Sequence, residues 1–255
     1  MMRNNIPKKS SLWDFLLAMG IILVLWQVLT LFFPPLVLPG IKSVILKLRE
    51  IFTTPAFYKM IGLTMERMVF GLFIGVAAGL FLGILMGAVG QLRRLFMPMI
   101  GILQTVPPVS WVVLALVWFG FNGRPVVFII VVSTIPVIAI SVCEGFTRID
   151  SKLLQMAFLY RFSHKKTLRH VIFPSITPYF QSAFRIALGA GWKIAVMGEV
   201  LTTSDGIGGM IKLARLNIEP DSIIAWSAVI VGLFYLSDFF IDRFFRGKGN
   251  PHAGN

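Results

Sequence analysis

Apolar residues in this 255-residue chain are gathered into blocks of roughly 20, the length that a helix needs to cross about 30 Å of hydrocarbon. Backbone amides in lipid need internal partners, and the period-two alternation of a membrane β-barrel is missing, so the blocks predict helices. Charged residues make up only 14% of the chain, well below a soluble domain. We expect an all-α membrane protein with about six transmembrane helices, at Leu12–Phe33, Met68–Val89, Met97–Phe119, Pro125–Cys143, Phe180–Leu201 and Ile223–Ile241.

Lys and Arg are distributed unevenly between the segments that join these blocks. With the N-terminus inside, 14 of the 24 lie in cytoplasmic segments, 8 lie on the opposite side, and Arg185 and Lys193 lie within the fifth block. Cytoplasmic loops of membrane proteins carry an excess of positive charge, so this distribution favours both termini in the cytoplasm. Membrane topology also accounts for the net charge of +13, so we expect no nucleic-acid partner.

The chain is predicted to divide into three parts within the inner membrane. Residues 1–67 hold an uncleaved first membrane helix and a periplasmic segment, with a short helix at Ile41–Phe52 outside the bilayer. Residues 68–245 form a five-helix core, and residues 246–255 form a cytoplasmic tail. The core contains the longest and most basic cytoplasmic loop, residues 147–173, which is where a cytoplasmic partner would dock.

The second block carries a glycine at every fourth position. This spacing places the glycines along one helix face, where the missing side chains let another backbone approach closely. Two interpretations stay open, packing against another helix of the same chain and a homodimer contact. The residues are Gly71, Gly75, Gly79, Gly83 and Gly87.

The sequence offers no candidate catalytic centre. Its nearest approach to a phosphate-binding loop, residues 247–249, lacks the upstream glycine and the Ser or Thr of a Walker A sequence. His164 and His170 lie in a basic loop with no metal-ligand spacing around them, and Cys143 is a lone cysteine in an apolar stretch. We therefore expect a protein that is not an enzyme and that binds no metal or cofactor itself.

The cytoplasmic loop predicts a short amphipathic helix. Leu153, Leu154, Ala157 and Tyr160 recur at helical spacing, and Pro174 is placed to open the next membrane helix. This loop resembles the coupling loop of binding-protein-dependent ABC importer permeases, which reads Glu-Ala-Ala, three residues, Gly, nine residues, Ile-x-Leu-Pro. The positions that match this coupling loop by spacing are Gln155, Met156, Ala157, Tyr160, Arg161 and Pro174.

Further stretches resemble the nitrate, sulfonate and taurine branch of that family, in order along nearly the whole chain. They include the glycine-rich second block, a Pro-Pro pair followed by Trp-Phe-Gly, and an Arg-Ile-Ala-Leu-Gly helix with a later Trp and Glu. The stretches are Val37–Gly40, Arg67–Gly87, Val106–Pro108, Val117–Gly120, Phe184–Gly189, Trp192, Glu199, Gly206–Gly208 and Asp238.

The resemblance implies a type I ABC importer-like permease. Its partners would be a second permease chain, expected as a homodimer, a cytoplasmic ATPase dimer that holds ATP and Mg²⁺, and a periplasmic or lipid-anchored binding protein. Two positions depart from the family pattern, since Gln155 replaces a Glu and Arg161 replaces the turn-forming Gly. Arg161 is either a contact to an acidic patch on the ATPase or a solvated charge.

Ionisable residues also lie within the membrane blocks, where they are costly and usually face protein or water. We expect Arg185 to pair with Glu144, while Glu199 lies on a different helix face from Lys193. Lys193 is not typical of the family pattern. It either attracts an anionic substrate in the translocation path or extends towards the membrane surface.

The paired prolines within the third block predict a kink that lines a cavity. Each polar residue near it has the alternative of simply bonding a neighbouring helix. The candidate lining residues of the translocation path are Gln104, Thr105, Pro107, Pro108, Ser110, Ser133, Thr134 and Lys193.

Together these features predict the permease subunit of an ATP-driven importer for a small solute. The resembling branch handles nitrate, taurine, sulfonates and bicarbonate, and Lys193 leans towards an anion. Two other classes stay open: a secondary transporter or channel that works without an ATPase, and a scaffold without transport.

Overall fold

The computed structural model describes residues 12–246, which contain helices and no strand. The side chains of Leu12, Phe15, Phe244 and Arg246 are not described. The helices are α1 (Leu12–Leu29), α2 (Ile41–Thr53), α3 (Ala56–Ala88), α4 (Gly90–Thr105), α5 (Pro108–Phe119), α6 (Arg124–Thr147), α7 (Ser151–Leu159), α8 (His164–Thr167), the π-helix η1 (Leu168–Ile172), α9 (Phe173–Thr202), α10 (Gly206–Leu216) and α11 (Pro220–Arg246).

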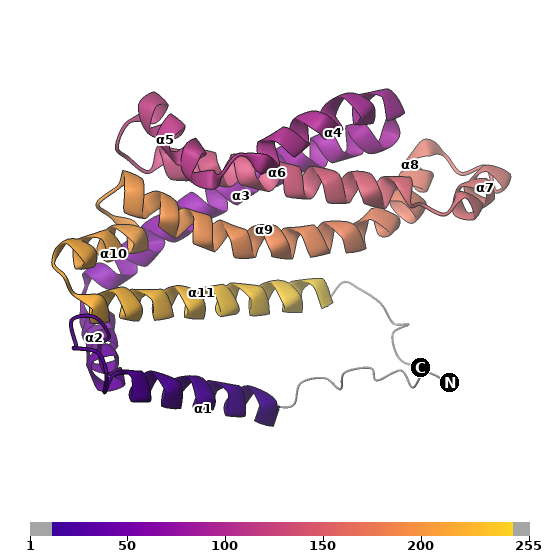
Figure 1. Cartoon of the computed structure of the whole chain (residues 1–255). Helices are drawn as coiled ribbons and strands as arrows, with labels where there is room; N and C mark the ends of the chain where they lie inside the picture. The colour runs from indigo at the N-terminus through magenta and orange to yellow at the C-terminus, as the bar shows by residue number, and fades with distance from the viewer. Residues whose placement is uncertain (1–11, 247–255) are drawn as a thin grey trace.

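Helices α6, α9 and α11 lie in succession, and α3 crosses them (Figure 1). α7 projects from one end of this bundle, while α2 and α10 lie at the other end. The first turn of α1 and the last turn of α11 both point towards the α7 end. This arrangement places both ends of the described chain on the side of α7, as the predicted topology requires.

Three helices, α3, α6 and α11, are long and apolar enough to cross a membrane by length and composition. The α4–α5 pair passes the same test as one broken span, while the shorter apolar stretch of α1 is Leu16–Leu29. The 30-residue α9 would measure about 45 Å and is long enough, although it carries three ionisable residues. The six predicted blocks therefore correspond to α1, α3, α4–α5, α6, α9 and α11.

The third predicted span is not one continuous helix. α4 ends at Thr105, α5 begins at Pro108, and the two helices are bent by 91°. Pro107 and Pro108 have no backbone N–H to donate, so the hydrogen-bond ladder stops there. The second span also differs from its prediction, because α3 begins at Ala56 and carries Arg67 within the same helix.

The glycine face of α3 (Gly71, Gly75, Gly79, Gly83 and Gly87) packs against α6 of the same chain. A Cβ added at Gly71 would come within 2.7 Å of the Ile130 side chain, and one at Gly75 within 2.7 Å of Thr134. Contacts this short leave no room for a methyl group, so the glycines set the α3–α6 distance. The intramolecular interpretation is therefore confirmed, and a homodimer contact on this face is wrong because α6 fills it.

Helix α2 confirms the short helix predicted after the first block, and it ties α1 to the start of α11. The Trp26 indole donates to the Pro39 carbonyl at 3.1 Å, just before α2. The Ser43 hydroxyl donates to Asp221 of α11 at 3.0 Å. Lys47 Nζ lies 3.1 Å from Glu50 Oε2, and the hydrogen bond that Lys47 donates to this carboxylate raises the pKa of Lys47. These contacts brace the end of the bundle opposite α7.

Candidate functional site

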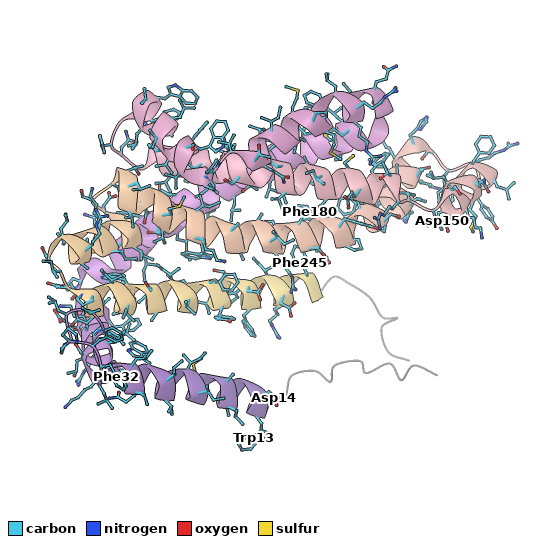
Figure 2. All side chains as sticks on the ribbon, in the orientation of Figure 1. Trp13, Asp14, Phe32, Asp150, Phe180 and Phe245 are labelled. Carbon is cyan, nitrogen blue, oxygen red and sulfur yellow. The ribbon has the colours of Figure 1, made fainter. Side chains whose placement is uncertain are left out.

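The α7 helix is built to stand away from the bundle. Asp150 caps its first turn by accepting the Lys152 N–H at 2.8 Å, and Ala157 is the one buried residue of α7. Figure 2 shows its side chains spreading outward at the end of the molecule beyond the labelled Asp150. Of the predicted amphipathic face only Ala157 is covered within the described chain, while Leu153, Leu154 and Tyr160 are exposed.

The exposed surface at the end of α7 is strongly apolar. Phe158 is 87% exposed and Leu159 is 78% exposed, with Met156 and Tyr160 beside them. We call these four residues the α7 surface. Apolar side chains exposed together in this way mark a contact with another protein or with the membrane.

A turn with a left-handed residue closes α7. The Phe162 N–H donates to the Ala157 carbonyl at 2.8 Å, and the Arg161 N–H donates to the Phe158 carbonyl at 3.0 Å. This pair of bonds is a Schellman motif, and Arg161 occupies its left-handed position with φ 52°. The turn that the family builds with glycine is thus formed here by an arginine. Its side chain, like that of Gln155, is exposed.

Basic side chains surround the α7 surface. The one acidic residue between Arg148 and His170 is Asp150, whose carboxylate is used as the α7 cap. The surface therefore suits a partner that offers an apolar groove with negative charge at its rim. The exposed basic residues are Arg148, Lys152, Arg161, Lys165, Lys166 and Arg169.

A second polar assembly lies at the opposite end of α9. Arg67 of α3 donates from Nη1 to Glu199 Oε1 at 2.8 Å and from Nη2 to Asp205 Oδ1 at 2.7 Å. Glu199 Oε2 accepts from the Thr64 hydroxyl at 2.8 Å, and Glu199 is 0% exposed. We call Thr64, Arg67, Glu199 and Asp205 the Arg67 cluster.

The Arg67 cluster also caps α10. The Ile207 N–H donates to Thr64 Oγ1 at 2.9 Å, and the Gly208 N–H donates to Glu199 Oε2 at 2.9 Å. Two other helices thus satisfy amides that the first turn of α10 cannot pair by itself. A Cβ at Gly206 or Gly208 would collide with Glu199, so these glycines permit the close approach. The cluster joins α3, α9 and α10.

Sequence reasoning placed Glu199 within the membrane but missed its partners. Arg67 was counted with the charges outside the membrane because the predicted span began one residue later, at Met68. The sequence did hold one signal for Arg67: a buried carboxylate such as Glu199 needs a cation and hydrogen-bond donors close to it.

The predicted pair of Arg185 and Glu144 is wrong. Arg185 of α9 instead forms an ion pair with Asp242 of α11. The last turns of α11 run beside the first half of α9, which brings Asp242 to Arg185. The sequence interpretation had considered only the fourth block for a partner.

The predicted path residues fall into three groups. Those at the α4–α5 break are exposed: Gln104, Thr105, Pro107, Pro108 and Ser110. Thr134 is 3% exposed and lies in the α3–α6 contact, which is the packing alternative left open by the sequence, while Ser133 is half-buried. Lys193 is exposed on α9.

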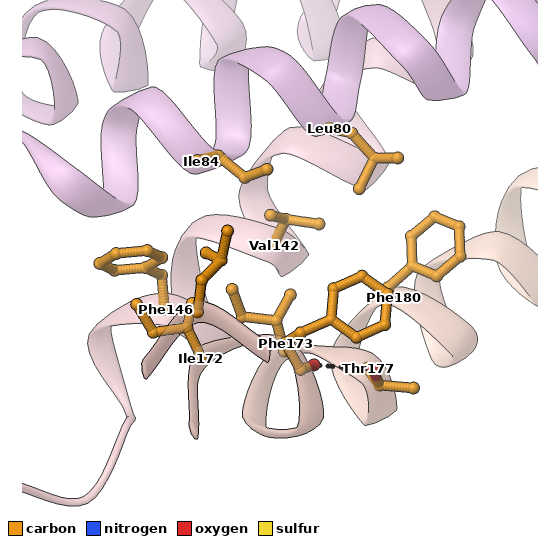
Figure 3. Close-up of a pocket in the computed structure, with 10 residues that line it drawn as sticks. Leu80, Ile84, Val142, Phe146, Ile172, Phe173, Thr177 and Phe180 are labelled. Atoms are coloured by element: carbon orange, nitrogen blue, oxygen red, sulfur yellow. Dashed lines mark hydrogen bonds between the residues drawn. The ribbon is translucent and has the colours of Figure 1, made fainter. Parts of the chain in front are cut away.

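An apolar cavity of about 180 Å³ lies where α3 and α6 meet η1 and the start of α9 (Figure 3). Its one polar side chain, Thr177, donates its hydroxyl to the Phe173 carbonyl at 2.7 Å. The cavity therefore offers nothing to a polar solute. Its lining is Leu80, Ile84, Val142, Phe146, Leu168, Ile172, Phe173, Ile176, Thr177 and Phe180. Within residues 12–246 no group of three or more His, Cys, Asp and Glu is placed to hold a metal ion.

Three characterised permeases are similar in sequence to most of this chain. The taurine transport system permease TauC of Escherichia coli is 28% identical over 86% of this chain and 84% of its own length. The nitrate import permease NrtB of Synechococcus elongatus is 27% identical over 90% of this chain and 85% of its own. The bicarbonate transport system permease CmpB of the same species is 31% identical over 71% of this chain and 64% of its own length.

Solved structures share the fold at low sequence identity. The inward-facing methionine ABC transporter MetNI matches with a TM-score of 0.67 and 19% identity, over 76% of this chain and 97% of that one. A bacterial alginate ABC transporter matches with a TM-score of 0.62 and 16% identity, over 93% and 98%. The fold is therefore that of a type I importer permease, as predicted.

The family described as "Binding-protein-dependent transport system inner membrane component" matches residues 75–247, from the glycine face of α3 to the end of α11. That match covers more than half of the chain and includes α7, α9 and the α10 cap. The chain belongs to this family and is an inner-membrane permease subunit of an ABC importer.

Proposed function

We propose that this permease takes its power from a cytoplasmic ATPase dimer that grips the α7 surface and carries the ATP and Mg²⁺. The single observation behind the proposal is an exposed apolar helix end on a capped helix, in a segment of the chain rich in exposed basic residues. η1 continues directly into α9, so a push on α7 passes through a short connection to a helix of 30 residues. The solved alginate relative, an ABC transporter in complex with a periplasmic protein, supports the assignment of a binding protein as well.

The proposed solute is a small molecule that carries an anionic group, passed between two copies of this chain after delivery by the binding protein. The names of the relatives support the class, since they include permeases for taurine, nitrate and bicarbonate. The exposed polar residues at the α4–α5 break are the proposed entrance to the path, because a broken span is tolerated where it lines a cavity.

The test is co-purification of the ATPase with permease variants of the α7 surface. Phe158→Glu with Leu159→Glu should release the ATPase and stop ATP-dependent uptake, because two carboxylates would enter an apolar contact. The control is Leu216→Glu, an exposed leucine at the end of α10, on the opposite end of the bundle. The proposal is wrong if the α7 variant keeps the ATPase bound at wild-type level. Solute flux through the permease alone would instead identify a channel or a secondary transporter.

A further inference from the structure

The ionisable residues of α9 do not all have partners. Glu199 is held by Arg67, Thr64 and the Gly208 amide, and Arg185 is held by Asp242. Lys193 has no hydrogen bond or ion pair with any residue of the described chain. Lys193 is therefore the cation of α9 that has no anionic partner among the described residues.

Lys193 lies well inside α9 and inside the predicted membrane block Phe180–Leu201. It lies nine residues before the end of α9 at Thr202 and twenty after its start at Phe173, or about 13 Å and 30 Å along the axis. The four methylenes of the lysine side chain are also shorter than the roughly 12 Å along the helix axis from Lys193 to Leu201, the nearer end of the predicted block. A lysine at such a position faces either protein or a water-filled path, because lipid does not solvate it.

Lys193 itself is exposed, while the side of α9 that carries it is only partly covered within the described chain, with Val196 one turn on buried. Residues one or two turns away on that side include Ile186, which is exposed, and Ala190 and Met197, which are half-buried. The opposite side buries Trp192, Ala195 and Glu199 against the bundle.

Glu199 is not available to neutralise Lys193. Its two oxygens already accept three hydrogen bonds, from Thr64, Arg67 and the Gly208 amide, and its side chain is fully buried on the other side of α9. Asp238 of α11 lies at a different level, because Gly189 already packs beside Phe234 and the two helices run in opposite directions. The anion that matches Lys193 must come from outside the described residues.

We propose that Lys193 is the solute-binding residue of the translocation path and that it contacts the negatively charged group of the solute directly. This inference rests on the proposed import of a small molecule that carries an anionic group and names the residue that selects it. The ammonium group would bind a sulfonate, carboxylate or oxoanion by a charge-assisted hydrogen bond. Because two copies would face each other across the path, each solute would meet two such cations.

Uptake by the complete transporter, with its ATPase and binding protein in proteoliposomes, is the first test, with taurine, nitrate and bicarbonate as probes. Lys193→Met removes the charge at similar length and should raise the KM for the transported solute about tenfold or more. Lys193→Arg should stay within about threefold of wild type, because it keeps a donor cation. Lys59→Met, at an exposed lysine in the first turn of α3, is the matched control and should change nothing.

Thiol labelling separates a water-filled path from lipid without measuring transport. Cys143 is the single cysteine, so Cys143→Ser gives a cysteine-free background. In that background Lys193→Cys should react with a negatively charged methanethiosulfonate, and soluble anion should protect it. Ala187→Cys, buried on α9, should not react, and Lys59→Cys should react without protection. Protection that requires anionic lipid in the vesicle instead of soluble anion would assign Lys193 to a lipid headgroup.

The inference is overturned if Lys193→Met transports every probe with the wild-type KM, or if Lys193→Cys is as unreactive as Ala187→Cys. Import of only uncharged or cationic solutes by the wild-type complex would also overturn it. A complex whose uptake needs no ATP would contradict the proposed coupling but not the role of Lys193, because the comparison of Met, Arg and wild type at this position would still decide it.

Discussion

Arg67 on α3 and Glu199 on α9 form an ion pair in which the carboxylate is completely buried, with Nη1 and Oε1 2.8 Å apart. Thr64 and the Gly208 amide occupy the second carboxylate oxygen, so the charge is fully hydrogen-bonded. An ion pair of this kind holds three helices in one arrangement but contributes little net stability relative to an apolar contact. Removing one member of the pair, by contrast, leaves the other charge buried without its partner.

The first prediction concerns that pair. Arg67→Met should destabilise the folded permease by about 3–5 kcal/mol, because it leaves the buried Glu199 without its cation. Glu199→Gln should cost less, since the amide keeps the shape and the Thr64 hydroxyl can adapt to it. Thermal unfolding of the purified protein, followed by the loss of the monodisperse species, measures both changes.

The double variant Arg67→Met with Glu199→Gln is the decisive control. If the two residues act as a pair, the double variant should be more stable than Arg67→Met alone. Additive losses would show that the two side chains stabilise the protein independently, contrary to the geometry of the Arg67 cluster.

The second prediction concerns the glycines at the start of α10. Gly206→Ala and Gly208→Ala should each destabilise the protein by about 1–3 kcal/mol, because the new methyl group would overlap Glu199. Gly206 also has φ +75°, which adds strain for alanine. The matched control is Gly232→Ala in α11, where a Cβ would meet no atom within 4 Å. That variant should be neutral or slightly stabilising, and equal losses at all three positions would contradict the close approach.

The fold was predictable because its main constraints are local. Block length fixed the membrane helices, and the four-residue glycine spacing identified the α3 face that contacts α6. The prolines at 107 and 108 predicted a break, although the sequence does not encode the 91° angle, which depends on what α5 packs against. Helix ends were less predictable, since α3 continues past its apolar block to Ala56.

The partners of charged residues were harder to predict because they depend on contacts between distant helices. Arg185 and Asp242 are 57 residues apart in sequence, and Arg67 and Glu199 are 132 apart. Periodicity shows which side of a helix a residue occupies but not which helix lies opposite. Lys193 was identifiable from sequence as an unusual cation, whereas its lack of a partner needed the positions of α3, α10 and α11.

The third prediction concerns the turn after α7. Arg161→Gly should stabilise the turn by about 1 kcal/mol, because a left-handed backbone is strained for arginine and not for glycine. Slower hydrogen exchange at the Phe162 amide, which closes the turn on Ala157, would measure this gain. Tyr160→Gly is the control, since Tyr160 has φ −81° and glycine offers no relief there.

The same variant decides what the Arg161 side chain does. If it contacts an acidic patch, Arg161→Gly should weaken ATPase binding despite the more stable turn, and the difference should shrink at high salt. Equal or tighter binding at all salt concentrations would identify a solvated charge. An unchanged amide exchange rate would contradict the assignment of strain to this position.

The fourth prediction concerns Arg185 and Asp242. Arg185→Asp should reduce stability, because it places two carboxylates together between α9 and α11, and so should Asp242→Arg. The exchanged pair, Arg185→Asp with Asp242→Arg, should recover most of the loss, since the opposite charges meet again. The pair is partly exposed, so we expect each single loss to be about 1 kcal/mol or less in aqueous surroundings. Glu144→Gln should leave all of these values unchanged. If Glu144→Arg instead recovered the stability lost in Arg185→Asp, then Glu144 and not Asp242 would be the partner of Arg185.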